Sequence, residues 1–320
     1  MALTSENLMI PNLRHLSYVV AVAEHGSIAK AAQAIGVSQP AISAAIKACE
    51  DEFGLRLFVR SPARPLSVTS TGWEFVARTR IFLDAARDYH MQSLGLSRAP
   101  VGTLNVACLV LIAAYLMPPI IKAMAKSNPG ITINLCEGDL DEIIQMVKRG
   151  TVEAALTYDL HFDKDVAFEV LFEASPYALL SANDPLANQE AVSLEQLATR
   201  PLALLDLPVT DVYMRNYFAI HGLEPSIGFK TKRAEMIRSL VGAGLAYSIF
   251  IFHPANRESY DGSPLAYLPI KERLPKSKVV LARAKHYVPT QIVKAFMEQC
   301  RTTFQVDDAM GPFLLRPTGP

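Results

Sequence analysis

Three polar residues, Gln39, Ser43 and Lys47, follow one another at intervals of four within the stretch GSIAKAAQAIGVSQPAISAAIKACEDEFG, residues 26–54. A spacing of four places side chains on one face of an α-helix. An amide, a hydroxyl and an ammonium group all donate hydrogen bonds, so this face can bind an acceptor-rich partner. The other side chains of the stretch are mostly small, which lets a backbone approach a second surface closely.

Two short helices must position this donor face. Ser27 is expected to cap a helix over residues 28–35, and Ser38 a second helix with Pro40 in its first turn. Gly36 supplies the permissive backbone for the turn between them. On the second helix we predict a buried stripe at spacings of four, three and four, made of Ile42, Ile46, Cys49 and Phe53. On the first helix we expect a core of Ala31, Ala32, Ala34 and Ile35.

The stretch RLFVRSPARPLSVT, residues 56–69, is typical of a strand, a turn and a second strand. Arg60 and Arg64 lie on either side of the turn, where they form either a phosphate-binding pair or a solvated surface pair. Beyond it, Phe75, Phe82 and Tyr89 recur every seven residues, with Ala86 between them. This period is typical of a coiled-coil seam, which would pair with a second copy or pack on the rest of the chain.

From residue 101 onward, strand and helix patterns alternate to the end of the 320-residue chain, as in a parallel α/β sheet. We expect two α/β lobes, the last strand and helix returning to the first lobe. Half of the residues are hydrophobic and the formal net charge is zero, so only a local basic patch can attract a polyanion. The N-terminus lacks a secretory signal, and no apolar run reaches about 20 residues without interruption.

A ligand cleft is expected between the lobes, lined by the carboxyl ends of strands. The candidate effector-binding residues at these ends are Cys108, Leu109, Asp139, Thr157, Tyr158, Asp206, Lys230, Tyr247 and Ser248. Tyr158 and Tyr247, together with Phe229 and Phe250, indicate that an aromatic or partly apolar ligand fits. Each strand-end position can equally be a wall of the pocket or an ordinary loop.

Residues 27–60 and the following LSVTSTG closely match one known pattern. The matching residues are Ala31-Ala32, Ser38-Gln39-Pro40, Ser43, Glu50, Leu57-Phe58 before Arg60, Thr69 and Gly72. This pattern resembles the winged helix-turn-helix of the LysR-type transcriptional regulators. The resemblance is specific over residues 12–72 and architectural after about residue 100. The family has longer polar residues after Ser43, where this chain has Ala44-Ala45.

The resemblance implies an N-terminal all-α winged helix-turn-helix DNA-binding domain (residues 12–70), a dimerising linker helix (71–98) and a periplasmic-binding-protein-like effector domain (99–305). Lobe one would take 99–172 and 272–305, lobe two 173–271, and a C-terminal tail 306–320. The implied partners are double-stranded promoter DNA, a small organic acid or aromatic effector, and further copies in a homodimer or a tetramer of two dimers. The expected location is the cytoplasm, away from membranes. The DNA-binding residues would be Ser27, Ser38, Gln39, Pro40, Ser43, Lys47, Arg60 and Arg64.

Other classes of protein are less well supported. No nucleophile elbow, P-loop, zincin motif or dinucleotide fingerprint occurs, and the seven histidines show no metal spacing, so we expect neither an enzyme nor a cofactor or metal. A thiol-sensing regulator remains an alternative, because Cys108 and Cys136 end neighbouring strands and a disulfide between them is conceivable. A second alternative is a small-molecule-binding protein whose N-terminal unit mediates protein contacts.

Overall fold

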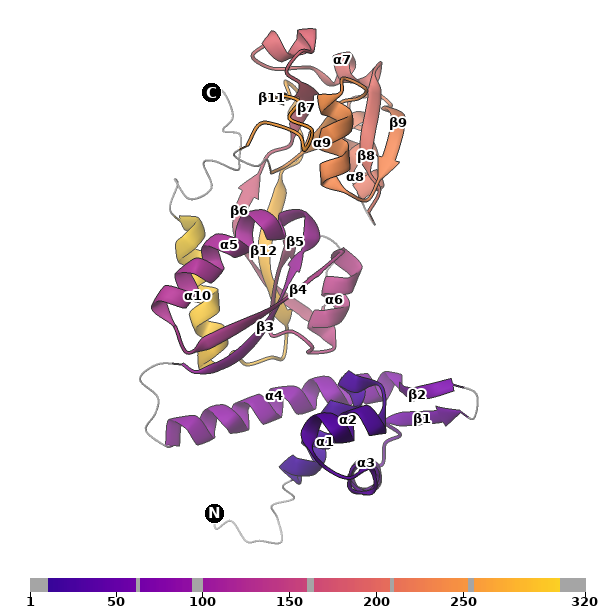
Figure 1. Ribbon diagram of the computed structural model, residues 1–320, viewed down its shortest axis with the longest axis vertical. Helices are drawn as coiled ribbons and strands as arrows, with labels where there is room; N and C mark the ends of the chain where they lie inside the picture. The colour runs from indigo at the N-terminus through magenta and orange to yellow at the C-terminus, as the bar shows by residue number, and fades with distance from the viewer. Residues whose placement is uncertain are drawn as a thin grey trace.

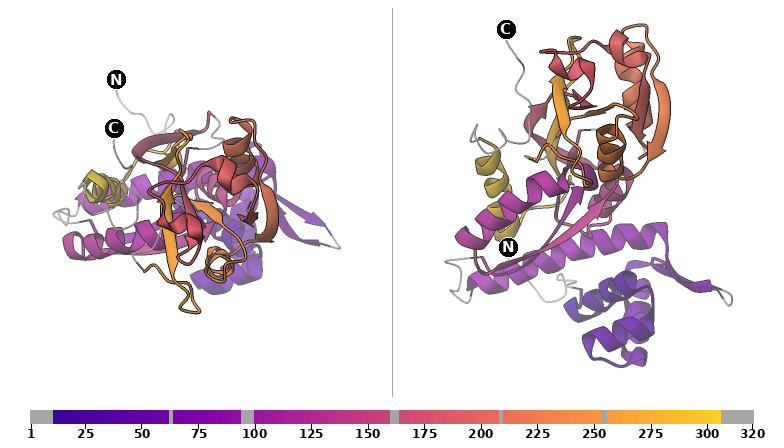
Figure 2. Two further views of the ribbon diagram at one scale, coloured as in Figure 1. Left: turned by 90° about the horizontal axis from the view of Figure 1, so that it is seen from above. Right: turned by 45° about the horizontal axis from the view of Figure 1, so that its top comes forward.

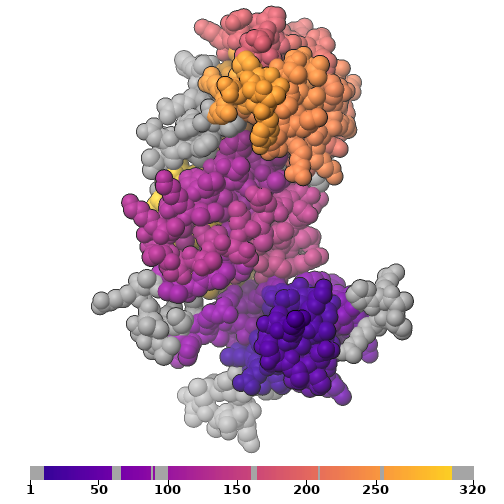
Figure 3. Space-filling model, in the orientation of Figure 1, coloured from indigo at the N-terminus to yellow at the C-terminus, as the bar shows by residue number. Residues whose placement is uncertain are grey.

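The computed structural model describes residues 11–61, 64–93, 100–159, 164–207, 210–252 and 256–305. Three bodies follow one another along the long axis: a small helical unit, an α/β lobe (lobe one) and a second α/β lobe (lobe two) (Figure 1). The space-filling view shows the helical unit as a separate mass beneath lobe one (Figure 3). The expected tail, residues 306–320, lies outside the described residues.

The helical unit contains three helices and a two-stranded wing. These elements are α1 (Leu13–His25), α2 (Ile28–Ile35), α3 (Gln39–Phe53), β1 (Phe58–Ser61) and β2 (Arg64–Val68). Gly36 ends α2 in the left-handed region with φ of 70°, which confirms the predicted turn. Ala31, Ala32 and the stripe of Ile42, Ile46 and Cys49 are buried, as predicted.

Three residues that were predicted to be buried in this unit are exposed. Ala34 is exposed, Ile35 keeps 39% of its surface and Phe53 keeps 39%. The predictions for these residues are wrong because only one face of the short α2 meets α1 and α3, and because Phe53 lies on the last turn of α3. There the ring of Phe53 packs edge-on against Phe75, with 5.0 Å between ring centroids.

Lobe one is built on a five-stranded sheet with the order β4-β3-β5-β12-β6. Strands β3, β4 and β5 are parallel, and β12 is antiparallel to both of its neighbours. Helices α5 and α10 cover one face of the sheet and α6 covers the other (Figure 2). The elements are β3 (Gly102–Leu109), α5 (Val110–Ser127), β4 (Ile131–Gly138), α6 (Leu140–Lys148), β5 (Ala154–Tyr158), β6 (Val166–Ala174), β12 (Ser277–Ala284) and α10 (Gln291–Gln305).

Helix α5 is long and apolar enough to cross a membrane by length and composition alone. Its buried face instead forms much of the core of lobe one, through residues that include Ile112, Leu116 and Ile120. The length and apolar composition of α5 are also those of a core helix, so they are only weak support for a membrane-spanning helix.

Lobe two has a three-stranded sheet, β10-β7-β11, and a parallel pair, β8 and β9. Its elements are β7 (Tyr177–Ser181), η2 (Pro185–Asn188), α7 (Leu194–Ala198), β8 (Pro201–Leu205), α8 (Thr210–Ala219), β9 (Ser226–Thr231), α9 (Ala234–Gly242), β10 (Ser248–Phe250) and β11 (Leu265–Pro269). The chain enters lobe two after β6 and leaves it after β11. The predicted return to the first lobe is therefore confirmed by β12 and α10.

The long helix α4 (Ser70–Ser93) lies between the helical unit and lobe one. Arg80 connects all three, because its guanidinium donates to the Arg149 carbonyl of lobe one at 3.0 Å and to the Glu24 carboxylate of α1 at 3.0 Å. The guanidinium of Arg149 in turn sits 4.8 Å from the centre of the Trp73 ring on α4, a cation–π distance. These contacts hold the start of α4 against the end of α6.

Glu153 is enclosed beside this contact. Asn105 donates to its carboxylate from the backbone at 2.7 Å and from the side chain at 3.3 Å. Glu153 lines a small cavity together with Arg80, Asp84 and Tyr287. Burial raises the pKa of Glu153 to about 7, the hydrogen bonds from Asn105 oppose this, and the nearby Asp84 adds to it.

A carboxyl group with a raised folded-state pKa destabilises the protein as pH rises. Between the ordinary pKa of a glutamate and about 7, the folded chain holds a proton that the unfolded chain releases, so the stability contributed by protonated Glu153 is lost as pH rises through this window. We therefore expect Glu153→Gln to raise the melting temperature by a few degrees at pH 8 and to have little effect at pH 5. Differential scanning fluorimetry across this range checks it. The exposed Glu190→Gln serves as control, and a Glu153→Gln effect that does not change with pH would contradict the pKa.

Candidate nucleic-acid interface and interlobe pocket

One face of α3 is open to solvent along its first half. Gln39 and Lys47 are exposed and Ser43 is half-buried, while Ile42 and Ile46 lie under 8% exposed on the adjacent face. The donor face that the sequence predicts is therefore free in this chain. Ala41 and Ala44 beside it are exposed as well, so the leading part of the helix presents little bulk.

Two serines cap the helices of this unit. The Ser38 hydroxyl accepts a hydrogen bond from the Ala41 N–H at 3.4 Å, and the Ser27 hydroxyl accepts one from the Lys30 N–H at 3.5 Å. Pro40, in the first turn of α3, needs no N–H partner at that place. The positive end of the α3 dipole lies at Gln39, the first residue of the donor face, where it favours a negatively charged partner.

The acidic residues of α3 lie at its other end. Glu50 is turned inward: its carboxylate accepts from the backbone N–H groups of Leu57 at 2.7 Å and Phe58 at 3.2 Å. This carboxylate fixes the start of the wing. The separation keeps negative charge away from Gln39 and from the wing turn.

The wing is an antiparallel pair in which Phe58 lies opposite Val68 and Ser61 opposite Arg64. Arg60 and Arg64 therefore belong to the two strands that flank the turn. Their side chains, and residues 62–63, lie outside the described part of the structure. The phosphate-binding role of the two arginines stays a prediction.

An aromatic groove runs along α4. Phe82 keeps 42% of its surface and Tyr89 75%, although both belong to the predicted seven-residue seam. The groove itself is lined by Phe82 and Phe75 of α4 together with Leu16 of α1 and Phe53 of α3, so the first part of the seam packs partly on the helical unit of its own chain. Lobe one packs on another side of α4, and the rings of Phe82 and Tyr89 remain exposed.

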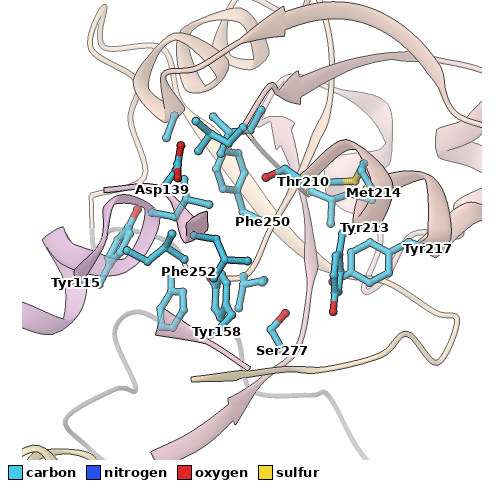
Figure 4. Close-up of a pocket in the computed structure, with 18 residues that line it drawn as sticks. Tyr115, Asp139, Tyr158, Thr210, Tyr213, Met214, Tyr217, Phe250, Phe252 and Ser277 are labelled. Carbon is cyan, nitrogen blue, oxygen red and sulfur yellow. The ribbon is translucent and has the colours of Figure 1, made fainter. Parts of the chain in front are cut away.

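A pocket with a cavity volume of about 120 Å³ opens between the two lobes. Lobe one supplies the ends of β3, β4 and β5, and lobe two supplies α8, the start of α9 and the segment after β10 (Figure 4). The lining is Leu109, Leu111, Tyr115, Asp139, Leu140, Tyr158, Leu205, Leu207, Thr210, Tyr213, Met214, Tyr217, Ala234, Ile249, Phe250, Ile251, Phe252 and Ser277.

Of the nine candidate effector residues, Leu109, Asp139 and Tyr158 line this pocket. Asp139 also caps α6, its carboxylate accepting from the Glu142 N–H at 3.0 Å. The other six do not belong to this lining, and an effector-binding role for any of the nine stays a prediction. The six are Cys108, Thr157, Asp206, Lys230, Tyr247 and Ser248.

The structure places these six candidate residues in the cores of the lobes, on strands or at the surface. Cys108 and Tyr247 are buried in the cores of lobes one and two. Thr157 is buried on the strand, Ser248 donates to the Ala203 carbonyl at 2.8 Å, and the Lys230 ammonium lies 3.9 Å from Asp211. Asp206 is exposed. Successive residues of a strand point to opposite faces, so a strand end brings only every second side chain to the pocket.

Sequence reasoning missed most of the wall from lobe two. Tyr213 and Tyr217 come from α8 and Thr210 from its first turn, and all three face the pocket (Figure 4). The spacing of four between the two tyrosines was a usable signal, since it puts both rings on one face of the helix. Ser277, at the start of β12, gave no signal at all.

The thiols are not arranged as a reactive pair. Cys49, Cys108 and Cys300 are buried and Cys136 is half-buried. Burial raises the pKa of Cys49 to about 11, and it raises the pKa of Cys108 and Cys300 well above the ordinary range. In the β3–β4 register Cys108 lies opposite Glu137, so Cys108 and Cys136 point to opposite faces of the sheet. The disulfide considered between them is therefore contradicted.

Comparisons with known proteins cover nearly the whole chain. The family model described as "Bacterial regulatory helix-turn-helix protein, lysR family" matches residues 13–73, and the model described as "LysR substrate binding domain" matches residues 97–305. Among curated proteins, a hydrogen peroxide-inducible genes activator of Pectobacterium carotovorum is 27% identical and covers 92% of this chain and 96% of its own length.

Solved structures of full length agree with this. HinK, a LysR family transcriptional regulator from Pseudomonas aeruginosa, is 29% identical with a TM-score of 0.63, covering 92% of this chain and 99% of its own. CbnR in complex with its target DNA is 25% identical with a TM-score of 0.54, covering 91% and 99%.

We expect the burial of each cysteine to decide how fast its thiol reacts with an alkylating reagent. In the native protein at pH 8, iodoacetamide should label Cys136 at least tenfold faster than Cys108, because a thiol must be accessible and ionised to react. Peptide mass spectrometry of timed samples measures this, and labelling in urea, where all four cysteines should react, is the control. Equal rates for Cys108 and Cys136 in the native protein would show that Cys108 is accessible as a thiolate.

Proposed function

Because the chain belongs to the LysR family of transcriptional regulators, we propose that α3 reads promoter DNA and that an effector in the interlobe pocket modulates this binding. The single observation that supports DNA binding is the open face of Gln39, Ser43 and Lys47 on a helix whose neighbouring face, with Ile42 and Ile46, is buried in the core. A major groove about 12 Å wide admits such a helix when its leading side chains are small. We place the protein in the cytoplasm, where promoter DNA is available.

Each residue of the interface has a role that its chemistry suggests. The Gln39 amide can pair bidentately with adenine, while Ser43 can reach a base edge or a phosphate. Lys47 lies one turn further along and meets phosphate. The capping residues Ser27 and Ser38, together with Pro40 in the first turn of α3, would set the position of the N-terminus of α3 against the DNA backbone. Arg60 and Arg64 of the wing would hold the adjacent phosphates.

Two elements of lobe one run from the pocket to the linker helix. Helix α6 begins at the pocket with Leu140 and ends beside Arg149, which contacts Arg80 and Trp73 on α4. Strand β5 ends at the pocket with Tyr158 and is preceded by Glu153, next to α4. We propose that effector binding changes lobe closure, shifts these two elements against α4 and so favours one of two DNA-bound geometries.

Pairing of two α4 helices would cover the aromatic groove. Phe82 and Tyr89 stay exposed in one chain, and a seven-residue repeat of aromatic side chains is buried when two such helices pack side by side. A dimer also supplies two DNA-binding heads for a two-fold symmetric site. Two dimers joined through their effector domains would form the homotetramer.

A thiol-sensing mechanism is the second candidate, since a curated relative is named for hydrogen peroxide induction. In this chain Cys49, Cys108 and Cys300 are buried while Cys136 is half-buried, and burial raises the pKa of Cys108 and of Cys300. Such thiols react slowly with peroxide. We therefore favour a bound effector, and we expect Cys108→Ser to leave DNA binding with and without peroxide unchanged.

Substitutions on α3 test the DNA interface. In a mobility-shift assay with the upstream region of the gene, Gln39→Ala should weaken binding about 5- to 30-fold, as expected for one bidentate base contact. Lys47→Ala should weaken binding to any sequence and lower the salt slope of log K by about one, because one phosphate contact is lost.

The matched control is Gln33→Ala, which removes an exposed amide from α2 instead of α3. It should bind DNA like the parent protein. If Gln39→Ala and Gln33→Ala behaved alike, α3 would not be the reading helix. If binding did not weaken with salt, contact to proteins rather than to DNA would be favoured.

A charge placed on the aromatic groove tests the dimer. Phe82→Asp should shift the protein toward the monomer by at least tenfold in dissociation constant, because a carboxylate would be buried between two helices. Analytical ultracentrifugation measures this. The control is Arg87→Ala on the exposed part of α4, which should leave assembly unchanged. A Phe82→Asp protein that stays fully dimeric would remove α4 from the interface.

A further inference from the structure

The interlobe pocket is walled by aromatic rings from both lobes. Tyr115 of α5 stacks on Phe252, which follows β10 and packs into the core of lobe one, with 5.6 Å between centroids and 22° between ring planes. Across the pocket, Tyr213 and Tyr217 meet edge to face at 6.5 Å. Figure 4 shows these two pairs on opposite sides with Tyr158 between them. Space between aromatic walls favours a flat ring, which gains edge and face contacts with both.

The lining offers no positive charge to an acid. Its other members are apolar except for Asp139, Thr210 and Ser277, and no lysine, arginine or histidine belongs to it among the described residues. The nearby Arg238 is engaged elsewhere, with the Tyr267 hydroxyl at 2.6 Å and the Glu258 carbonyl at 2.6 Å. Among the described residues of the lining, Asp139 alone supplies a carboxylate, and a carboxylate at this place repels an anion.

The pKa values of the pocket tyrosines indicate how strongly burial in the pocket disfavours a negative charge. Burial raises the pKa of the Tyr217 hydroxyl to about 12, despite a hydrogen bond with Ser277, and raises the pKa of Tyr158 further. The same desolvation acts on a carboxylate of a bound molecule, and without a counter-charge it costs several kcal/mol.

The N-terminus of α5 favours a negative charge in the pocket, but this effect is weaker than the cost of desolvation. Leu109 caps this helix and no side chain accepts from its first N–H groups, so the end of the dipole favours a negative atom. A helix terminus contributes about 0.3–1 kcal/mol in favour of an anion, less than the desolvation it would have to offset. Free N–H groups are, however, well suited to the neutral oxygen of a hydroxyl or carbonyl group.

We propose that the effector is an aromatic compound without an acidic group, carrying a neutral hydroxyl or a protonated amine. The rings lie between the two aromatic walls, a hydroxyl meets the N-terminus of α5 or the Thr210 and Ser277 hydroxyls, and an amine meets the Asp139 carboxylate. This ligand class rests on the proposed function of the pocket as the effector site. It narrows the sequence-based expectation, which also allowed an organic acid.

Three probes with one ring system test the class. Tryptophol, tryptamine and indole-3-acetate share the indole ring and differ in a hydroxyl, an ammonium and a carboxylate. Isothermal titration of the full-length protein should show that tryptophol and tryptamine bind at least tenfold more tightly than indole-3-acetate. Equal or tighter binding of indole-3-acetate would overturn the proposal, and so would the failure of all three probes to bind.

Two variants locate the binding. Asp139→Asn keeps an N-cap of equal quality and removes the charge. It should weaken tryptamine about fivefold or more and leave tryptophol unchanged; an unchanged tryptamine affinity would contradict the role of Asp139. Ile251→Trp, a half-buried lining residue, should fill the pocket and abolish binding of both probes, and unaltered binding would place the probes elsewhere.

The DNA-binding assay separates this proposal from the proposed function. Ile251→Trp should still shift promoter DNA without ligand, which shows that the variant is folded. If indole-3-acetate binds best while DNA binding persists, the ligand class is wrong and the regulator stands. If the probes bind in the predicted order but the protein does not bind DNA, the ligand class stands and the regulatory role fails.

Discussion

The division of α3 into a buried stripe and an open face is the constraint on which the DNA-binding unit depends. Ile42, Ile46 and Cys49 pack into the core that α1 and the wing complete, which fixes the rotation of the helix. Glu50, one position after the stripe, holds the wing through two backbone N–H groups. With the rotation fixed, the small leading residues and the donors Gln39 and Lys47 have only one direction in which to point, which is toward solvent or a partner.

The contact between α4 and lobe one sets how a signal can travel. Arg80 joins α1, α4 and the end of α6 through two hydrogen bonds, and Trp73 receives the guanidinium of Arg149. Both α6 and β5 are rigid elements with one end at the pocket and the other at this contact. In the proposed mechanism, a change in lobe closure would therefore act on the linker helix directly, without a long chain of side chains between the two sites.

Sequence alone predicted the parts of this protein that local rules determine. The Gly36 turn, the Ser38 cap and the stripe of α3 follow from spacing and backbone preference, and the LysR resemblance supplied the order of the domains. Sequence reasoning failed where tertiary packing decides: Ile35 and Phe53 are apolar yet each keeps 39% of its surface exposed, because neighbouring elements cover these side chains only in part. In the pocket it found the strand ends but chose Cys108 and Tyr247, which point into the cores, and it missed Tyr213 and Tyr217 on α8. The way in which the two lobes close decides which face of a strand end meets the other lobe. No local sequence pattern predicts that closure.

The most direct measurement of the central claim is a hydroxyl-radical footprint of the full-length protein on the upstream region of its gene. A pair of α3 helices carried by paired α4 helices should protect two patches on one side of the duplex, with centres separated by a whole number of turns of about 10.5 base pairs. Protection of two such patches is the predicted result. A uniform ladder without protected patches, under conditions where the protein is folded and dimeric, would contradict the account.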